Sequence, residues 1–249
     1  MYKLTRLDGM DFYSGTVDYA GSIGKIIRIT DYDTSSNPCG RGLHASRNPN
    51  DCFIGAKIPC RAFRVKGINR LAGDKQKSRY KALKIIAEIK DLNKLFGWNY
   101  TEAINPIHPF KIKPPKITEN EIALLKVWDS VGDSVRGSVG DSVRASIWDS
   151  VRGSVGVSVG GLVGGVVGGL VWDSVGDSVG GLVWDSVWGY IGSLFPDIKN
   201  WKYISHEKGI YPYQCCVDLW KQGLVPSYDG KVWRLHGGPI AKILFEFTP

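Results

Sequence analysis

The sequence predicts a central β-solenoid built from a four-residue repeat, flanked by an α+β N-terminal domain and a small α+β C-terminal cap. Val or Ile fills every fourth position of residues 127–194 without a break. Before the repeat, short runs rich in β-branched residues alternate with Gly and Pro, which is typical of short strands and turns. An aromatic-rich segment with turn residues follows it. We therefore expect a domain at 1–104, a Pro-rich connector with a short helix at 105–126, the repeat at 127–194 and the cap at 195–249.

The solenoid prediction depends on the phase of the repeat. The second position is always Trp, Arg or Gly, the third is mostly Asp or Gly, and the fourth is Ser and later often Leu or Val. On an α-helix a four-residue repeat drifts by about 40° each time, so the Val stripe would spiral around the axis. A β-strand has a period of two and keeps every Val on one face. Gly, Ser, Asp and Val also propagate helices poorly. Long packed helices are the alternative.

The repeat also bears on function. Its variation at the second and third positions fits single-base changes in a twelve-nucleotide tandem expansion, so the copy number is expected to vary. A stacked scaffold tolerates a variable number of units better than a catalytic site does. We therefore expect a non-enzymatic scaffold or interaction protein that binds a protein partner or a second copy of itself. The uncharged, Gly-rich stretch at 155–172 is too weakly apolar for us to favour a membrane span.

Charge and cysteines constrain partners and location. The formal net charge is +8, and the repeat holds seven Asp against three Arg, so the flanks carry about +12. Basic flanks suit an anionic partner, whether nucleic acid, a phosphate ligand or another copy's repeat, although ordinary solubility explains them too. Five cysteines without framework spacing fit a reducing compartment, and the charged first residues do not resemble a signal peptide. These observations predict a cytoplasmic protein.

In the N-terminal part, residues 25–30 and 61–65 are predicted strands, and a helix is predicted from residue 75 to residue 96. The first half of that helix is basic, ending in Lys84, and Gly97 ends it. Binding of nucleic acid by the basic residues of this helix is the weakest of the partner predictions, because no aromatic platform for nucleic-acid bases accompanies them.

The sharpest local motif is Cys-Gly-Arg-Gly-Leu-His-Ala-Ser at 39–46. Its glycines permit tight turns or the close approach of a ligand. His44 and Ser46 fall on the same side of a strand, where a ring nitrogen and a hydroxyl can orient one ligand. A purely structural histidine is the alternative. Cys39, Cys52 and Cys60 lack the Cys-x-x-Cys spacing of zinc sites, so no metal is predicted.

The run from Gly9 to Ile89 resembles a family of uncharacterised phage and bacterial domains that share this Gly-Leu-His-Ala motif. The motif also resembles the strand of ADP-ribosyltransferase folds that reads Gly, an aromatic residue or His, any residue, and Ser or Thr. That resemblance implies NAD as a cofactor, contacted by His44 or Ser46, with Arg41 as a phosphate partner. Neither Glu88 nor Glu102 matches the position of the family's catalytic Glu. An NAD-binding protein or enzyme is therefore the alternative function.

The C-terminal part is predicted to begin with a short helix at 213–222 that Gly223 ends. A tight turn at 228–231 then precedes two strands of a hairpin, at 231–236 and 240–247. This pattern resembles the C-terminal module that accompanies Val-x-x-Ser repeats in uncharacterised phage and gut-bacterial proteins. It predicts a cap on the last repeat, with a small ligand patch at Trp233, Arg234 and His236 as the alternative.

Overall fold

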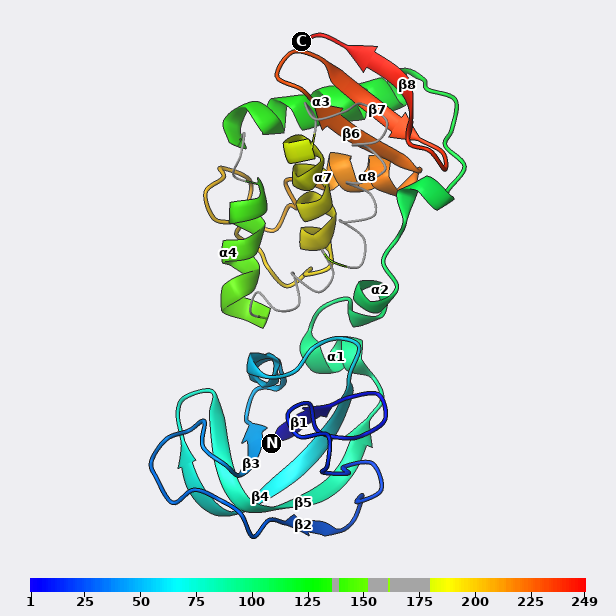
Figure 1. The fold of residues 1–249 in the computed structure, drawn as a ribbon. Helices are drawn as coiled ribbons and strands as arrows, with labels where there is room; N and C mark the ends of the chain where they lie inside the picture. The colour runs from blue at the N-terminus through cyan, green and yellow to red at the C-terminus, as the bar shows by residue number, and fades with distance from the viewer. Residues whose placement is uncertain (136–138, 152–160, 162–179) are drawn as a thin grey trace. The chain divides into compact units, whose positions relative to one another are not determined.

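The computed structural model describes residues 1–135, 139–151, 161 and 180–249 (Figure 1). The chain divides into two compact units, Met1–Gly97 and Trp98–Pro249. The first unit is mainly β-structure, and the second packs helices against a three-stranded sheet.

The first unit is a small antiparallel barrel. Its strands are β1 (Tyr2–Thr5), β2 (Ile26–Arg28), β3 (Leu43–Ser46), β4 (Arg61–Gly73) and β5 (Lys77–Ile89). The order is β2-β5-β3-β1-β4, and β4 also pairs with β5, so β5, β3, β1 and β4 close a ring. Figure 1 shows β4 and β5 as the long hairpin of this unit. Inside lie the buried side chains of Tyr19, Leu43, Ala45, Phe63, Val65, Tyr80, Leu83 and Ile85.

The helix predicted at 75–96 is wrong, because most of that segment is strand β5. Leu83 and Ile85 are fully buried while Lys84 between them is exposed, which is the period of a strand. A register shift then places Ile86 between two paired residues, since Val65 pairs with Ile85 and Arg64 pairs with Ala87. This bulge changes the phase of the apolar residues and imitates helical spacing. Only α1 (Leu92–Phe96) is helical, and Gly97 ends it in the left-handed conformation.

The second unit contains the described parts of the repeat and the C-terminal segment. Its helices are α2 (Tyr100–Ile104), α3 (Glu119–Val135), α4 (Val139–Val151), α7 (Gly180–Ser193) and α8 (Gln214–Lys221). Its sheet has the order β6 (Leu224–Tyr228), β7 (Trp233–Gly237) and β8 (Lys242–Phe247). The 3-10 helices η1 (Pro49–Ile54) and η2 (Pro109–Lys111) lie in the first and second units respectively. The predicted C-terminal helix and hairpin are confirmed.

The β-solenoid prediction is wrong for the described repeats, which form α3, α4 and α7. In α4 the first-position residues Val139, Val143 and Ile147 are all buried. Three such residues span only about 80° of the helix circumference, which fits within the apolar stripe of an ordinary amphipathic helix. Over the described length of α4, the drift of the repeat therefore stays within one apolar face. Packed helices, the alternative, describe these segments.

The fourth-position serines also fit these helices. The hydroxyl of Ser186 donates to the Val183 carbonyl at 2.7 Å, and Ser130 donates to Val127 at the same distance. Each bond runs from the last residue of a repeat to the first, so the spacing of the repeat supplies it. The buried Ser186 is thereby satisfied within its own helix, and tertiary packing outweighs its modest helix propensity.

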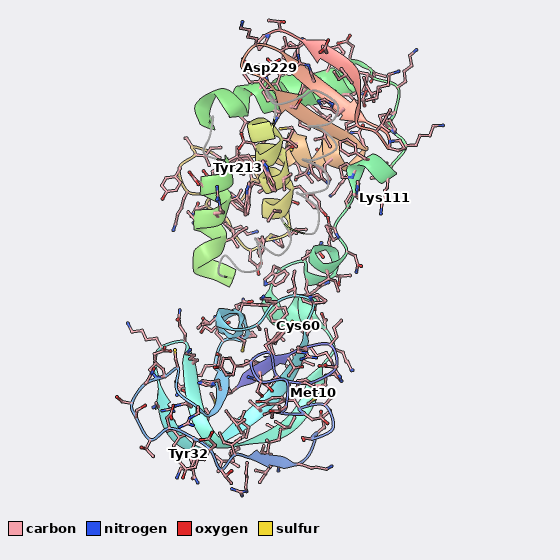
Figure 2. The ribbon with its side chains drawn as sticks, viewed as in Figure 1. Met10, Tyr32, Cys60, Lys111, Tyr213 and Asp229 are labelled. Carbon is pink, nitrogen blue, oxygen red and sulfur yellow. The ribbon has the colours of Figure 1, made fainter. Side chains whose placement is uncertain are left out.

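Helices α4 and α7 pack side by side through their second-position residues. The guanidinium of Arg144 lies 5.0 Å from the centre of the Trp188 ring, in a cation–π contact. A Cβ added to Gly140 would lie 3.1 Å from Cδ1 of Trp188, so Gly140 leaves room for that ring. Figure 2 shows Tyr213 between these helices, where its ring meets Trp128 of α3 edge to face at 6.2 Å.

Within the described residues, no helix combines the length and apolar character that crossing a bilayer requires. The segment 155–172, which was considered as a span, lies outside them apart from Gly161.

A substitution in β4 tests the barrel packing. The Tyr80 ring covers Gly67, and a Cβ there would lie 2.3 Å from Cε1 of that ring. We expect Gly67→Ala to lower the unfolding free energy by about 1–3 kcal/mol, because the buried ring must move. Urea unfolding measures the change. Gly55→Ala is the control, since nothing lies within 4 Å of its added Cβ; an equal loss in both variants would contradict the packing argument.

Candidate functional site

The three predicted site residues lie on β3 and the loop before it. His44 pairs with Arg79 across the β3–β5 ladder, and Ser46 pairs with Lys77 on one side and with Tyr2 on the other. The alternation of β3 places His44 and Ser46 on one side of the strand, as expected. Arg41 lies in the loop, two residues before β3 begins.

Arg79 of β5 organises this loop, although its side chain is fully buried. Nη1 donates to the Arg41 carbonyl at 2.9 Å, and Nη2 donates to the Ser35 carbonyl. Asp33 adds an ion pair at 3.7 Å from Nη1. A buried cation is stable only when such partners replace water. The loop before β3 therefore wraps around a guanidinium that belongs to the protein itself.

The glycines of the motif allow the loop to pass close to the Arg79 side chain. A Cβ on Gly40 would lie 2.4 Å from Nη1 of Arg79, and one on Gly42 would lie 2.4 Å from Cγ of the same side chain. The glycines permit a close approach, as the motif predicted, but the group that lies against them is the Arg79 side chain and not a ligand. The motif is thus explained by an internal contact.

Arg41 has internal partners as well. Its guanidinium contacts Asp31 and Asp33, with N–O distances of 3.0 Å to each. Asp33 also accepts from the Arg41 backbone amide at 2.7 Å, and these hydrogen bonds lower the pKa of the Asp33 carboxyl. A cation with two carboxylate neighbours is a poor partner for phosphate, because the acids compensate its charge.

His44 is held neutral. Its Nε2 lies 3.0 Å from the Pro38 carbonyl, which can only accept, so Nε2 carries the proton. Burial lowers the pKa of His44 to about 4, and the nearby charge of Lys3 lowers it further, while the hydrogen bond to Pro38 opposes both. At neutral pH the ring is therefore uncharged, with one nitrogen occupied by the loop.

Ser46 is buried, with 3% of its surface exposed, and bonds to the thiol of Cys52. The Cys52 sulfur also contacts the Tyr2 carbonyl at 3.4 Å. Burial raises the pKa of this thiol, so it stays protonated and is a weak nucleophile. The structure thus brings Ser46 to Cys52, a pairing that the strand pattern did not indicate.

The two glutamates considered for catalysis are in structural contacts. Glu88 binds the Arg61 guanidinium through both oxygens, at 2.8 and 2.9 Å, and these bonds lower the pKa of its carboxyl to about 2. Glu102 lies in the second unit, where it accepts a hydrogen bond from the Tyr190 hydroxyl at 2.9 Å. Each carboxylate therefore has a partner within its own unit.

The side chains of the predicted C-terminal ligand patch also have partners within the protein. Nε1 of Trp233 donates to Asp129 at 2.6 Å, which ties β7 to the first repeat. Arg234 forms ion pairs with Asp229 and Glu246. The buried His236 contacts the Ser227 hydroxyl at 2.8 Å through Nε2. These side chains fix the sheet to the helices.

All five cysteines are free thiols. Over the described parts of the chain, no three His, Cys, Asp or Glu side chains come together as metal ligands would.

Sequence reasoning missed Arg79 and Asp11. The Asp11 carboxylate accepts four backbone amides, including Ser14 at 2.7 Å and Val17 at 3.0 Å. Burial alone would raise its pKa, but these hydrogen bonds lower it to about 2. An aspartate followed closely by Ser, Gly and Thr is a turn signal that could have indicated this role. No local signal indicated Arg79, because its partners lie more than thirty residues away along the chain.

Comparison of the chain with protein-family models, with curated proteins and with solved structures finds no match. The resemblances drawn from the motifs stay predictions.

The lowered pKa of His44 predicts a specific pH dependence. Because the folded pKa of about 4 lies below the ordinary 6.5, protons bind the unfolded chain preferentially as the pH falls between these values. Stability present above pH 6.5 should therefore decline toward pH 4. We expect His44→Gln, whose amide can still donate to Pro38, to remove part of this decline. Chemical unfolding across the pH range measures it; identical slopes for the two proteins would refute the assignment.

Proposed function

We propose that the protein is a non-enzymatic interaction protein whose described repeat helices, α3, α4 and α7, associate between copies of the chain. The observation that carries the proposal is the contact of Trp188 with Gly140 and Arg144 between α4 and α7. All three occupy the second position of the repeat, where only Trp, Arg or Gly occurs.

This contact gives the restricted second position a physical meaning. Trp supplies a ring, Gly supplies the space for it, and Arg supplies a cation over its face. A cation–π contact contributes about 0.5–1 kcal/mol at an exposed site and more when water is excluded. Because the same three residue types recur along the repeat, one repeat helix offers complementary positions to another. A second copy of the chain carries the same positions.

Repeat residues in the described helices also leave apolar surface uncovered. Trp184, at the second position in α7, is 39% exposed, and Val127, at the first position in α3, is 51% exposed. A large aromatic ring that its own chain leaves partly uncovered suits a protein interface, where Trp is enriched. These residues favour a second copy as the partner.

The C-terminal segment supports the scaffold interpretation by anchoring the repeat. Tyr190 of α7 stacks on Trp220 of α8, with ring centres 5.2 Å apart. Trp233 of β7 holds Asp129 in the first repeat. The first repeat, at 127–130, and the repeat at 187–190 are thus both fixed to the C-terminal helix and sheet.

NAD binding, the alternative, has less support from the site. Arg41 is ion-paired, His44 is bonded to Pro38, and Ser46 is bonded to Cys52. Each of these groups would have to exchange an internal partner for the ligand.

Sedimentation velocity over a wide concentration range tests the proposal. We expect the chain to associate reversibly, and Trp184→Gln to weaken association at least about tenfold, as truncation of an interface tryptophan commonly does. The unfolding midpoint should change little, because the ring is partly exposed. Tyr13→Gln is the control, since Tyr13 is a fully exposed aromatic residue outside the repeat.

Two outcomes would overturn the proposal. One is a chain that stays monomeric throughout, or that responds equally to both substitutions. The other is heat on calorimetric titration with NAD that His44→Ala abolishes, which would favour the alternative.

A further inference from the structure

The positive charge of the chain is concentrated in the barrel unit. Residues 1–97 contain 18 Lys and Arg against 9 Asp and Glu, a net charge of +9, whereas the whole chain carries +8. The second unit is therefore close to neutral, and any anionic partner is attracted chiefly to the barrel.

Four exposed cations lie close together on the sheet formed by β2, β5 and β4. They are Arg28, Arg64, Lys66 and Lys84. Lys84 of β5 lies directly between Ile26 of β2 and Lys66 of β4 in the pairing register, and all three are exposed. Arg28 and Arg64 are each two residues along their strands from this row. We call these four residues the basic face; Figure 1 shows the three strands that carry it.

The pairing of Lys66 with Lys84 is unfavourable by itself. Like charges directly opposite on antiparallel strands destabilise a sheet, because their Cβ atoms lie only about 5 Å apart. No ion pair with a carboxylate relieves this repulsion at any of the four cations, within the fully described barrel unit. Glu88 of β5, the nearest acid along the strand, is bound to Arg61 and Lys90.

We propose that the basic face binds the phosphate backbone of a nucleic-acid duplex. The face extends over about 13 Å along the strands and about 10 Å across them, from the spacing of residues and strands in a sheet. A duplex presents one negative charge about every 1.7 Å along its axis, so several phosphates fit over such an area. The bound phosphates neutralise the opposed lysines and remove their repulsion.

The form of the face favours a duplex over other anions. A single phosphate group needs donors that converge on one point, whereas these cations are spread over three strands. A membrane surface calls for Trp or Phe beside the cations, and the exposed apolar neighbours here are Ile26 and Ile86. Single strands need aromatic platforms for stacking. The only aromatic residue paired with any of the four cations is Tyr2, opposite Arg64, and its ring already lies 5.8 Å from the Arg64 guanidinium in a cation–π contact within the barrel.

Fluorescence anisotropy with labelled mixed-sequence duplexes of DNA and of RNA tests this proposal on the full chain. We expect binding that weakens with salt. In Lys66→Gln/Lys84→Gln, affinity should fall at least about tenfold, and the slope of log affinity against log salt should shrink by about 2, since each phosphate contact contributes roughly 0.9. Thermal stability should not fall, because the repulsion is removed.

The control is Lys57→Gln/Lys242→Gln, which removes the same charge from exposed positions outside the face. It should keep affinity within about twofold of the unmodified chain. The proposal is overturned if neither duplex binds, if the two double variants lose affinity equally, or if phosphatidylserine vesicles bind through Lys66 and Lys84 while duplexes do not. Self-association through Trp184 is measured separately and does not affect these outcomes.

Discussion

The drift of a four-residue repeat around a helix is the constraint on which the second unit depends. A helix can bury one repeat position over about three repeats before the stripe turns away from its neighbour. Helices α4 and α7 respect this limit, because their buried Val and Ile residues each span three repeats. In the described repeats, packing of helix on helix replaces the continuous interior that a solenoid would have, and it places Gly140, Arg144 and Trp188 where α4 and α7 meet.

This packing of repeat helices supports the proposed association between copies of the chain. Ser130 and Ser186 each donate to a carbonyl within their own helix, so the polarity of these two serines does not oppose packing. In the proposed role, the second position supplies the specificity, as Trp188 does within the chain where it meets Gly140 and Arg144. An interaction protein built in this way can vary its number of repeats without losing its complementary residues, because each unit carries them.

In the fully described barrel unit, the buried cation Arg79 organises a loop, whereas the four exposed cations of the basic face have no carboxylate partner. Arg79 fixes the loop before β3 by donating to carbonyls and by contacting Asp33. Its internal bonds account for the glycines and for the partners of Arg41. Lys66 and Lys84 pair with each other across the sheet. Neither has a carboxylate partner in the barrel unit, which is why we propose that an external anion binds them.

The sequence alone determined the elements that local signals govern. The strands at 25–30 and 61–65, the C-terminal helix before Gly223 and the final hairpin each follow from turn residues and β-branched runs. Tertiary structure decided the rest. Strand β5 differs from the predicted helix because a bulge at Ile86 changes the phase of its apolar residues. The described repeats differ from the predicted solenoid because tertiary packing outweighs their modest helix propensity. The sequence correctly assigned His44 and Ser46 to one strand, β3, but the partners of this motif lie in distant segments, and only folding brings Arg79 and Cys52 to it.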